Sequence, residues 1–353
     1  MTTDTSPRTD AGGGPAAGPP TMLWRRGGVV APGIAPQDIG AELRSSGDCS
    51  AWLFVPRRDS ETLRAAADYL GLDVLAVEDV LGDREGVKAD WLGDTLVALT
   101  PMVAYSRDAV ELSVEPVSLI AGRRILVVVA DDGAQPVLRT ALARAEAQVV
   151  DVGIPAALHA VLDRIVDGYS AALTAMQDDL DDMADMLFDD RPLARAEQLR
   201  SFGLRRSMGR LARITGPMRD VAASLANAAA RPGTGDAAGD PAATLLGTRM
   251  AREFSDVADH ANHADQATKS MREEIGSMYE TNLALSDVHL NMVMKKLSAW
   301  AAIIAVPTLI TGFMGMNVPY PGFSQRQGFL AAMVVIIVAV IGLYVVFKRK
   351  DWL

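Results

Sequence analysis

The chain has 353 residues, of which 49% are hydrophobic and 22% are charged, and its formal net charge is −10. This length can hold two or three domains, and this composition excludes a disordered or collagen-like chain. The single cysteine, Cys49, excludes a disulfide-stapled scaffold, and the acidic balance argues against general binding of nucleic acid.

The first half of the chain predicts an α/β domain that follows an unstructured start. Residues 1–22 are rich in Gly, Pro, Ser and Thr, and such a segment cannot bury enough apolar surface to fold. Between residues 23 and 150, short apolar runs alternate with amphipathic ones. Strands are expected at 51–56, 95–105, 115–122 and 124–130, and helices at 60–81 and 135–148. This stretch contains no Gly-rich phosphate loop.

From residue 155 onward the strand patterns stop and helical spacing takes over. Helices are expected at 155–188 and 192–228, followed by a turn-rich break at 231–241. Residues 242–296 contain no proline, and they lead directly into an apolar run. A single helix from about 245 to 314 would measure about 100 Å, which is typical of a stalk and not of a core element.

Acidic and histidine residues cluster on two of these helices. Aspartates at 178, 179, 181, 182, 185, 189 and 190 either attract cations or form a solvated helix face. His260 and His263 share a helical face with Asp259 and could bind zinc, although a pair of histidines at this spacing is more often part of an ordinary surface.

Two apolar runs, 297–314 and 328–347, are each long enough to cross a bilayer as a helix. Basic residues flank them, with Lys295 and Lys296 before the first run and 348–350 after the second. The positive-inside rule then places both flanks in the cytoplasm. We therefore expect a protein of the cell (inner) membrane with both termini cytoplasmic; two buried helices of a soluble core are the alternative.

The charge is divided along the same boundary. Residues 295–353 hold six basic residues and one acid and carry +5, which leaves −15 on residues 1–294. The acidic body is therefore expected in the cytoplasm, a reducing compartment that suits one free cysteine.

One face of the long helix carries small and polar side chains. Steps of three and four residues bring them onto a single stripe. The stripe consists of Glu280, Ala284, Asp287, Asn291, Met294, Ser298, Ala301, Ala305, Thr308 and Gly312, with Leu297 beside Met294. It suits a pore-lining face, with carboxylate rings at 280 and 287 and an apolar constriction near 294–297. Close packing between membrane helices also favours small residues and remains the alternative.

The end of the first apolar run carries Gly315-Met316-Asn317, ahead of a second span and a basic tail. In this context the chain resembles the CorA family of divalent-cation channels, whose signature is Gly-Met-Asn at this place. Further similar segments are Leu72–Leu81, Glu115–Leu119, Asp256–His260 and the final Lys350-Asp351-Trp352-Leu353. The resemblance covers residues from about 50 to 353.

This resemblance implies a homo-oligomer, a pentamer in the family, with Gly315, Met316 and Asn317 as its selectivity filter. Oxygen dipoles suit a hydrated Mg²⁺ ion, and a ring of Asn317 side chains would supply them. A helix cap is the other reading of Asn317, and the two roles are compatible.

The resemblance also implies regulation by cytoplasmic Mg²⁺ bound between neighbouring subunits. The matching carboxylates are Asp94 and Asp256, with Asp259 as a substitute ligand. Two like charges bridged by an ion would hold a closed state, and they would repel each other when the ion leaves. The alternative is that these acids are simply solvated. The basic ring of the family corresponds to Lys348, Arg349 and Lys350.

The chain departs from the family near the filter. The loop Val318-Pro319-Tyr320-Pro321-Gly322-Phe323 lacks the acid of magnesium-transporting members, and Met314 replaces an aromatic residue. Both changes weaken the assignment to Mg²⁺ over Zn²⁺, Co²⁺ or Ni²⁺.

The predicted function is a membrane channel for divalent cations, with Mg²⁺ as transported and regulatory ion, driven by the membrane potential. A Zn²⁺, Co²⁺ or Ni²⁺ transporter of the same fold and a non-transporting, membrane-anchored oligomeric sensor are the alternatives. No catalytic triad, nucleotide loop or paired-cysteine motif is present, so neither an enzyme nor an organic cofactor is expected. The expected partners are further copies of the chain, the lipid bilayer and divalent cations, without nucleic acid.

The predicted architecture is a CorA-like α/β cytoplasmic domain, a long stalk helix and two C-terminal transmembrane helices. Its expected segments are a disordered start (1–22), an α/β domain (23–150), a helical region (151–244), a stalk (245–296), a pore-lining span (297–316), an external loop (317–327), a second span (328–347) and a basic tail (348–353).

Overall fold

The computed structural model of the protein describes residues 21–25, 28–57, 59–82, 86–131, 133–187, 194–231, 240–316 and 325–353. The chain divides into two compact units, Met1–Ile275 and Gly276–Leu353.

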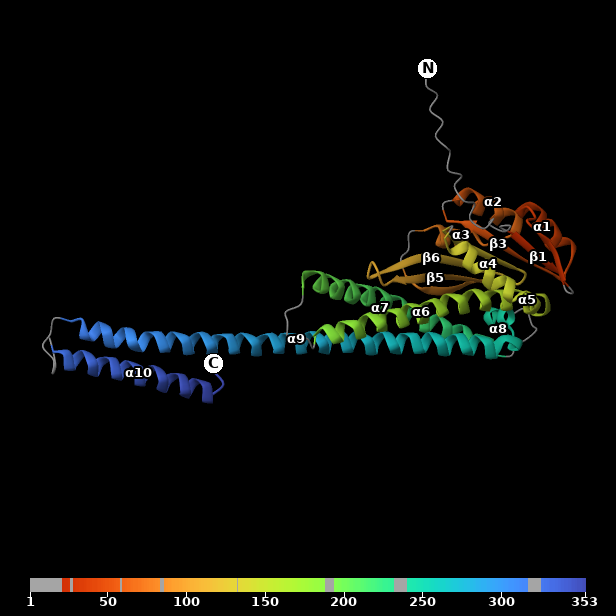
Figure 1. Ribbon diagram of the computed structural model, residues 1–353. Helices are drawn as coiled ribbons and strands as arrows, with labels where there is room; N and C mark the ends of the chain where they lie inside the picture. The colour runs from red at the N-terminus through yellow and green to blue at the C-terminus, as the bar shows by residue number, and fades with distance from the viewer. Residues whose placement is uncertain are drawn as a thin grey trace, which may run out of the picture. The chain divides into compact units, whose positions relative to one another are not determined.

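The first unit is built on a seven-stranded sheet (Figure 1). Its strand order is β2-β1-β3-β7-β6-β5-β4, and only β3 and β7 pair in parallel. The strands are β1 (Thr21–Arg25), β2 (Gly28–Pro32), β3 (Cys49–Pro56), β4 (Lys88–Leu92), β5 (Thr95–Ser106), β6 (Glu111–Ala121) and β7 (Ile125–Ala130). Runs of Val, Leu and Ile in β3, β5, β6 and β7 are buried, as expected for strands covered on both faces.

Helices cover both faces of this sheet. Alternate residues such as Leu53 and Val127 pack in one core with α1 (Pro36–Ser45), α2 (Ser60–Leu70) and α3 (Val74–Leu81). The intervening residues of β3, Trp52 and Phe54, are buried on the opposite face because strand side chains alternate.

The opposite face is covered by α4 (Ala134–Arg144), α5 (Glu146–Val152), α6 (Ile154–Leu187) and α7 (Arg195–Ala229). The Arg139 guanidinium of α4 lies over the Trp52 ring, 6.0 Å from its centroid. The buried Tyr169 hydroxyl of α6 donates to the Pro101 carbonyl of β5 at 2.8 Å. This layer therefore ties the long helices directly to the sheet.

The first part of α9 (Ala251–Met314) completes the unit, after α8 (Pro241–Leu246) and a 3₁₀ turn at Thr248–Met250. Its Asp265 carboxylate is 3% exposed and binds Arg219 of α7 at 2.6 Å and Lys269 at 2.7 Å. Two cations thus compensate one buried charge, which is the condition for such a charge to be tolerated.

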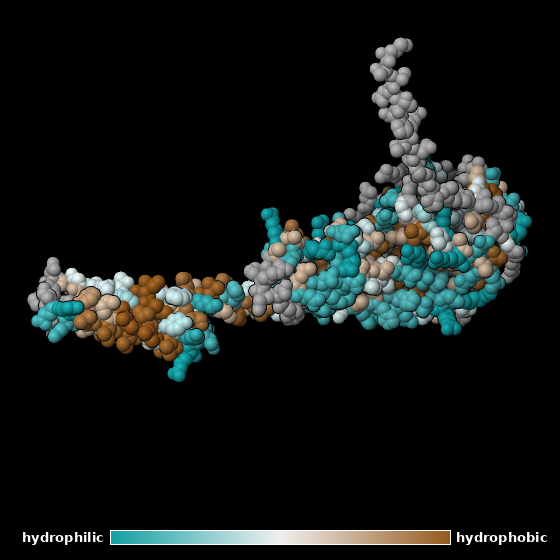
Figure 2. Space-filling model, in the orientation of Figure 1, coloured by the Kyte–Doolittle hydropathy of each residue, from teal (hydrophilic) through white to brown (hydrophobic). Residues whose placement is uncertain are grey.

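The second unit consists of the remainder of α9 and of α10 (Arg326–Arg349). Both helices contain stretches long and apolar enough to cross a membrane, and only 11% and 6% of those stretches are buried. A core helix of a soluble protein would be mostly buried, so the low burial favours membrane spans. Figure 2 shows apolar side chains gathered on the surface of these helices.

The predicted fold class is confirmed, but several element boundaries differ. The expected helix 60–81 is two helices, because Gly71 closes α2 in the left-handed region at φ 68°. Asp73 then caps α3 by accepting a hydrogen bond from the Leu75 amide at 2.8 Å. The expected helix 135–148 is likewise divided, between α4 and α5.

Further differences lie where sequence patterns are short. Strand β1 begins at Thr21, inside the stretch 1–22 expected to lack order, whereas residues 1–20 lie outside the described ranges. Strands β2 and β4 and helix α1 were not predicted. The long helix begins at Ala251 instead of about 245, because Gly247 at φ 67° ends α8.

Candidate pore face and metal site

The predicted pore stripe is exposed along its whole length within the second unit. The exposed members are Glu280, Ala284, Asp287, Asn291, Met294, Leu297, Ser298, Ala301, Ala305, Thr308 and Gly312. On the same helix Ala299 is 0% and Ile303 8% exposed, and Val306 and Ile310 are half-buried. At 100° per residue, this buried face lies about 160° from the stripe.

Helix α10 accounts for the buried face. A cavity of about 440 Å³ is shared by Thr311 and Met314 at the end of α9 and by Arg326, Phe329 and Met333 of α10. The two helices therefore adjoin one another on the side away from the stripe. The stripe stays free to face other copies of the chain or a pore.

Large apolar side chains flank the stripe on both sides. Trp300 and Ile304 lie on one side by helical angle, Leu309 and Phe313 on the other, and all four are exposed. The helix thus presents four surfaces: one against α10, two apolar flanks suited to lipid or neighbouring helices, and one of small and polar residues.

Polar side chains of the stripe form hydrogen bonds to the backbone of their own helix. The Thr308 hydroxyl donates to the Ile304 carbonyl at 2.8 Å, and the side-chain Nδ2 of Asn291 donates to the Asp287 carbonyl at 3.0 Å. Such bonds satisfy donors that would be costly in an apolar environment.

The predicted filter begins where α9 ends. The Gly315 amide donates to the Thr311 carbonyl at 2.9 Å, and a Cβ on Gly315 would lie 3.3 Å from that oxygen. A side chain at this position would therefore crowd the last helical turn. Met316 is half exposed, and Asn317 lies outside the described residues.

The predicted regulatory carboxylates occupy separate places in one chain. Asp94 lies in the exposed turn between β4 and β5, and its carboxylate is 3.7 Å from Arg123 Nε. Asp256 lies on α9 beside His260, at 3.9 Å between Oδ1 and Nε2. Asp259 is exposed on the same helix.

Asp256 and His260 meet a third candidate ligand, Asp163 of α6. One ligand atom from each of these residues lies within 4.8 Å of the others. Burial, together with the nearby Asp167 carboxylate, raises the pKa of Asp163, and Asp256 adds to the effect. His159 and His260 oppose the shift. A bound cation would relieve this repulsion between carboxylates.

The donor chemistry of this Asp163 cluster suits a divalent metal. Two carboxylates are ligands for Mg²⁺, whereas an imidazole suits Zn²⁺, Co²⁺ or Ni²⁺. The cluster therefore combines hard and borderline donors.

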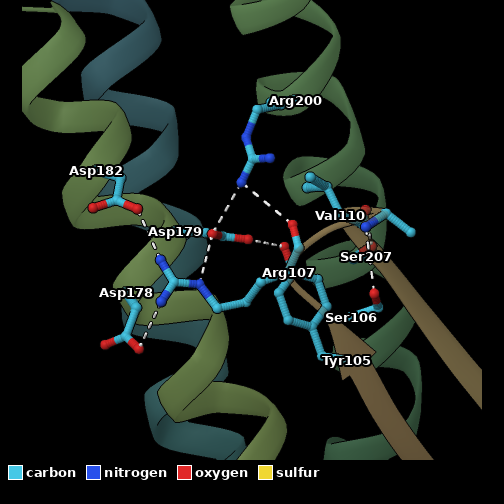
Figure 3. Close-up of polar contacts among 10 residues, drawn as sticks. Tyr105, Ser106, Arg107, Val110, Asp178, Asp179, Asp182, Arg200 and Ser207 are labelled. Carbon is cyan, nitrogen blue, oxygen red and sulfur yellow. Dashed lines mark hydrogen bonds and ion pairs between the residues drawn. The ribbon is translucent and has the colours of Figure 1, made fainter.

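Part of the acidic cluster on α6 has a structural role. Asp179 is 3% exposed and accepts hydrogen bonds from Tyr105, Arg107 and Arg200 (Figure 3). The same Arg107 also pairs with Asp178 at 3.3 Å and Asp182 at 2.8 Å. These three acids anchor the β5–β6 hairpin and are not simply a solvated face; Asp189 and Asp190 lie outside the described residues.

The basic tail closes α10 with a Schellman motif. Lys348 and Arg349 form the last helical turn and Lys350 is its cap. The Trp352 amide donates to the Phe347 carbonyl at 3.0 Å, with Asp351 left-handed at φ 54°. The Phe347 and Trp352 rings stack at 5.5 Å between centroids. The terminal Lys-Asp-Trp-Leu sequence is therefore a helix-ending device that fixes the basic residues.

Comparison with known proteins assigns the family. Residues 48–349 match the family model described as CorA-like Mg²⁺ transporter protein. The chain belongs to the CorA family. The resemblance drawn from Gly315-Met316-Asn317 is thereby confirmed.

Two curated relatives carry the CorA name. The cobalt/magnesium transport protein CorA of Thermotoga maritima is 24% identical over 298 residues, which are 83% of this chain and 80% of that protein. The cobalt/magnesium transport protein CorA of Methanocaldococcus jannaschii is 27% identical over 207 residues, which are 58% of this chain and 60% of that protein.

Solved structures share the CorA fold. The complete CorA magnesium transporter of Methanocaldococcus jannaschii matches with a TM-score of 0.73 at 20% identity, over 94% of this chain and 98% of that one. Full-length CmaX matches with a TM-score of 0.67 at 20% identity, over 96% and 99%. The cytoplasmic domain of ZntB from Vibrio parahaemolyticus reaches 0.51 at 9% identity, over 67% and 88%.

The candidate metal site contains Asp163, which the sequence analysis did not predict. It lies 93 positions before Asp256, so no local spacing connects the two. A signal was present, since Asp163 follows the buried Val161 and Leu162 and precedes the buried Ile165. A carboxylate in such a run is a functional candidate because burial perturbs its titration.

Proposed function

We propose that this CorA chain is one subunit of a homopentameric channel through which Mg²⁺ enters the cytoplasm. The observation that carries the proposal is the pore stripe, which lies opposite the face of α9 that α10 covers. A ring of subunits could place these stripes around a common axis while the apolar flanks meet lipid and neighbouring helices. The membrane potential would drive entry with about 4.6 kcal/mol per divalent ion at 100 mV.

The proposed path follows the stripe in order. Gly315, Met316 and Asn317 form the filter, where amide and carbonyl dipoles would hold a hydrated cation. Small residues at 301 and 305 leave room for the ion with its water. Met294 and Leu297 form an apolar constriction, and Glu280 and Asp287 place carboxylate rings at the cytoplasmic end.

Regulation is proposed to act through cytoplasmic divalent metal bound by carboxylates. Asp256 of one subunit, supported by Asp163 and His260, would share an ion with Asp94 of the next; Asp259 is the substitute ligand. The ion would offset the repulsion between the carboxylates and hold the closed state. Its loss at low metal concentration would favour opening.

A second ion class is supported by His260. Imidazole is a better ligand for Zn²⁺, Co²⁺ or Ni²⁺ than for Mg²⁺, and residues 318–323 contain no acid to concentrate hydrated Mg²⁺. These ions are therefore the alternative ions that the same pore would transport. The alternative function is that of a membrane-anchored oligomeric sensor that transports no ion.

The proposal places the protein in the cell (inner) membrane with both termini in the cytoplasm. Lys348, Arg349 and Lys350 would form a basic ring at the inner surface, consistent with the positive-inside rule. The protein is proposed to act without catalysis and without an organic cofactor.

Flux into liposomes tests the function. Purified protein in vesicles holding an ion-sensitive dye, under a potential of about 100 mV, should pass Mg²⁺, with Zn²⁺, Co²⁺ and Ni²⁺ as a comparison panel. Asn317→Ala should abolish or deregulate the flux, whereas Glu274→Gln, at an exposed position of α9 about 100° around the helix from the stripe, should not. An inert wild-type protein would favour the anchor function, and flux of Zn²⁺ without Mg²⁺ would reject the ion choice. The mass of the particle in detergent checks the pentamer.

A further inference from the structure

A cavity of about 640 Å³ lies in the first unit between the sheet and α7. Its walls come from β5, β6 and α7, and its rim includes Gly82, Gly86 and Val87 between α3 and β4. None of its lining residues belongs to the pore stripe or to the Asp163 cluster. Its volume falls in the range of ordinary small-molecule sites.

Three arginines, Arg57, Arg210 and Arg213, line this cavity, and its described lining contains no Asp or Glu. Arg57 directly follows β3 and is held there by a bond from its amide to the Ala130 carbonyl at 3.0 Å. Arg210 and Arg213 lie one turn apart on α7. Such convergence of positive charge is unexpected in a chain with a net charge of −10.

The three guanidinium groups differ in their hydrogen bonds and ion pairs with the protein. Arg210 Nη1 donates to the Leu112 carbonyl at 2.7 Å and lies 3.9 Å from Glu111. Arg57 and Arg213 have no side-chain ion pair or hydrogen bond with any residue that the structure describes. Arg57 is half-buried and Arg213 is exposed, and neither has a counter-charge among the described residues. An anion in the cavity would gain the attraction of both cations.

The remaining lining combines hydroxyl and apolar groups. Thr100 and Ser118 are each 1% exposed, and they come from paired strands β5 and β6. Leu99, Val117 and Ile214 add apolar surface. A ligand that fits must therefore present negative charge to the arginines and an apolar part to the wall.

We infer that this arginine cavity binds a phosphoryl-bearing organic anion. A guanidinium group can donate two parallel hydrogen bonds to the oxygens of one phosphate group. A cavity with several arginines and few carboxylates therefore favours a phosphate group. The apolar wall and the volume suit an organic group attached to the phosphate better than inorganic phosphate alone. Both a soluble nucleotide and a lipid headgroup have this chemistry. The inference is independent of transport.

Calorimetric titration of the full chain tests the site. The protein is prepared in detergent without phospholipid and with EDTA, so that metal sites are empty, and is titrated with ATP, inorganic phosphate, adenosine and dioctanoyl phosphatidylglycerol. ATP should bind with a Kd below about 1 mM, and phosphate and adenosine each about tenfold more weakly, since each has half of the required chemistry. Binding of the lipid in place of ATP would identify the headgroup as the source and would still support the site.

Matched variants separate this cavity from general charge attraction. Arg57→Gln and Arg213→Gln should each weaken binding about tenfold, because each removes one phosphate contact. Arg206, like Arg213, is exposed on α7, but it is not among the residues that line the cavity. Arg206→Gln removes the same charge and should change the Kd less than about twofold. Unchanged melting temperatures would show that the variants fold. Equal binding by all three variants and the wild type, or no binding of ATP and lipid at millimolar concentration, would overturn the inference.

Discussion

The buried Asp179 carboxylate accepts a hydrogen bond from the Tyr105 hydroxyl, with 2.6 Å between Oδ2 and the phenolic oxygen (Figure 3). Its other oxygen, Oδ1, binds Arg107 at 3.0 Å and Arg200 at 3.2 Å. Tyr105 lies at the end of β5, Arg107 directly after it, Asp179 on α6 and Arg200 on α7. One carboxylate thus joins the long β5–β6 hairpin to α6 and α7, two of the helices that cover one face of the sheet.

Asp179→Asn should destabilise the first unit by about 2 kcal/mol, because it weakens charge-assisted bonds in a buried site. Thermal unfolding of the full chain in detergent measures the loss as a lower apparent melting temperature. Asp185→Asn, at an exposed position of the same helix, removes the same charge and is the control. Equal melting temperatures of the two variants would contradict a structural role for Asp179.

Tyr105→Phe should lower stability at neutral pH by about 1 kcal/mol, through loss of one hydrogen bond. Burial, and then the bond to the Asp179 carboxylate, raises the pKa of Tyr105 above its usual value. A group whose pKa is raised by folding stabilises fully below its unfolded pKa, about 10, and loses that contribution as pH rises toward the folded value. The stability difference between wild type and variant should therefore shrink above about pH 10. A difference that stays constant from pH 7 to 11 would exclude this linkage.

Much of the fold was predictable because its patterns are long. The apolar strands β3, β5, β6 and β7, the helices α6 and α7 and the two apolar helices each carry a periodic signal over many residues. Strand β4 was missed because Lys88–Leu92 is short and contains charged residues, and its Lys88 is paired with Asp79 and Asp90 only after folding. The same limit applies to the site: a stripe on one helix is visible in the sequence, whereas the meeting of Asp163 with Asp256 depends on the packing of α6 against α9.

Asp163→Asn should alter both the metal-free stability and the response to metal. The variant removes one of the repelling carboxylates, so the metal-free protein should melt at a higher temperature than the wild type. Divalent metal at about 100 times its Kd should stabilise the wild type by about 2.7 kcal/mol and the variant by much less. Melting curves with and without Mg²⁺, Co²⁺ and Zn²⁺ measure both effects.

The control for this experiment is Glu273→Gln, which removes a charge from an exposed position of α9 outside the cluster and should respond to metal as the wild type does. Asp259→Asn tests the substitute ligand, because a reduced response would bring Asp259 into the site. A variant at 163 with a full metal response would exclude Asp163 as a ligand.

Cysteine accessibility distinguishes a pore face from close helix packing. Ala301→Cys and Ala305→Cys lie on the stripe, whereas Ile304→Cys and Leu309→Cys lie on the apolar flanks. A thiol in contact with water ionises and reacts with a charged, water-soluble thiol reagent, whereas one in lipid or in a packed interface does not. The stripe positions should react at least about tenfold faster than the flanks and lose ion flux on reaction.

The natural Cys49 is 1% exposed, so the wild-type protein should remain unlabelled and serves as the blank. Equal, slow reaction at all four positions would indicate that the small residues pack helices together, and faster reaction on the flanks would place the pore on another face of α9.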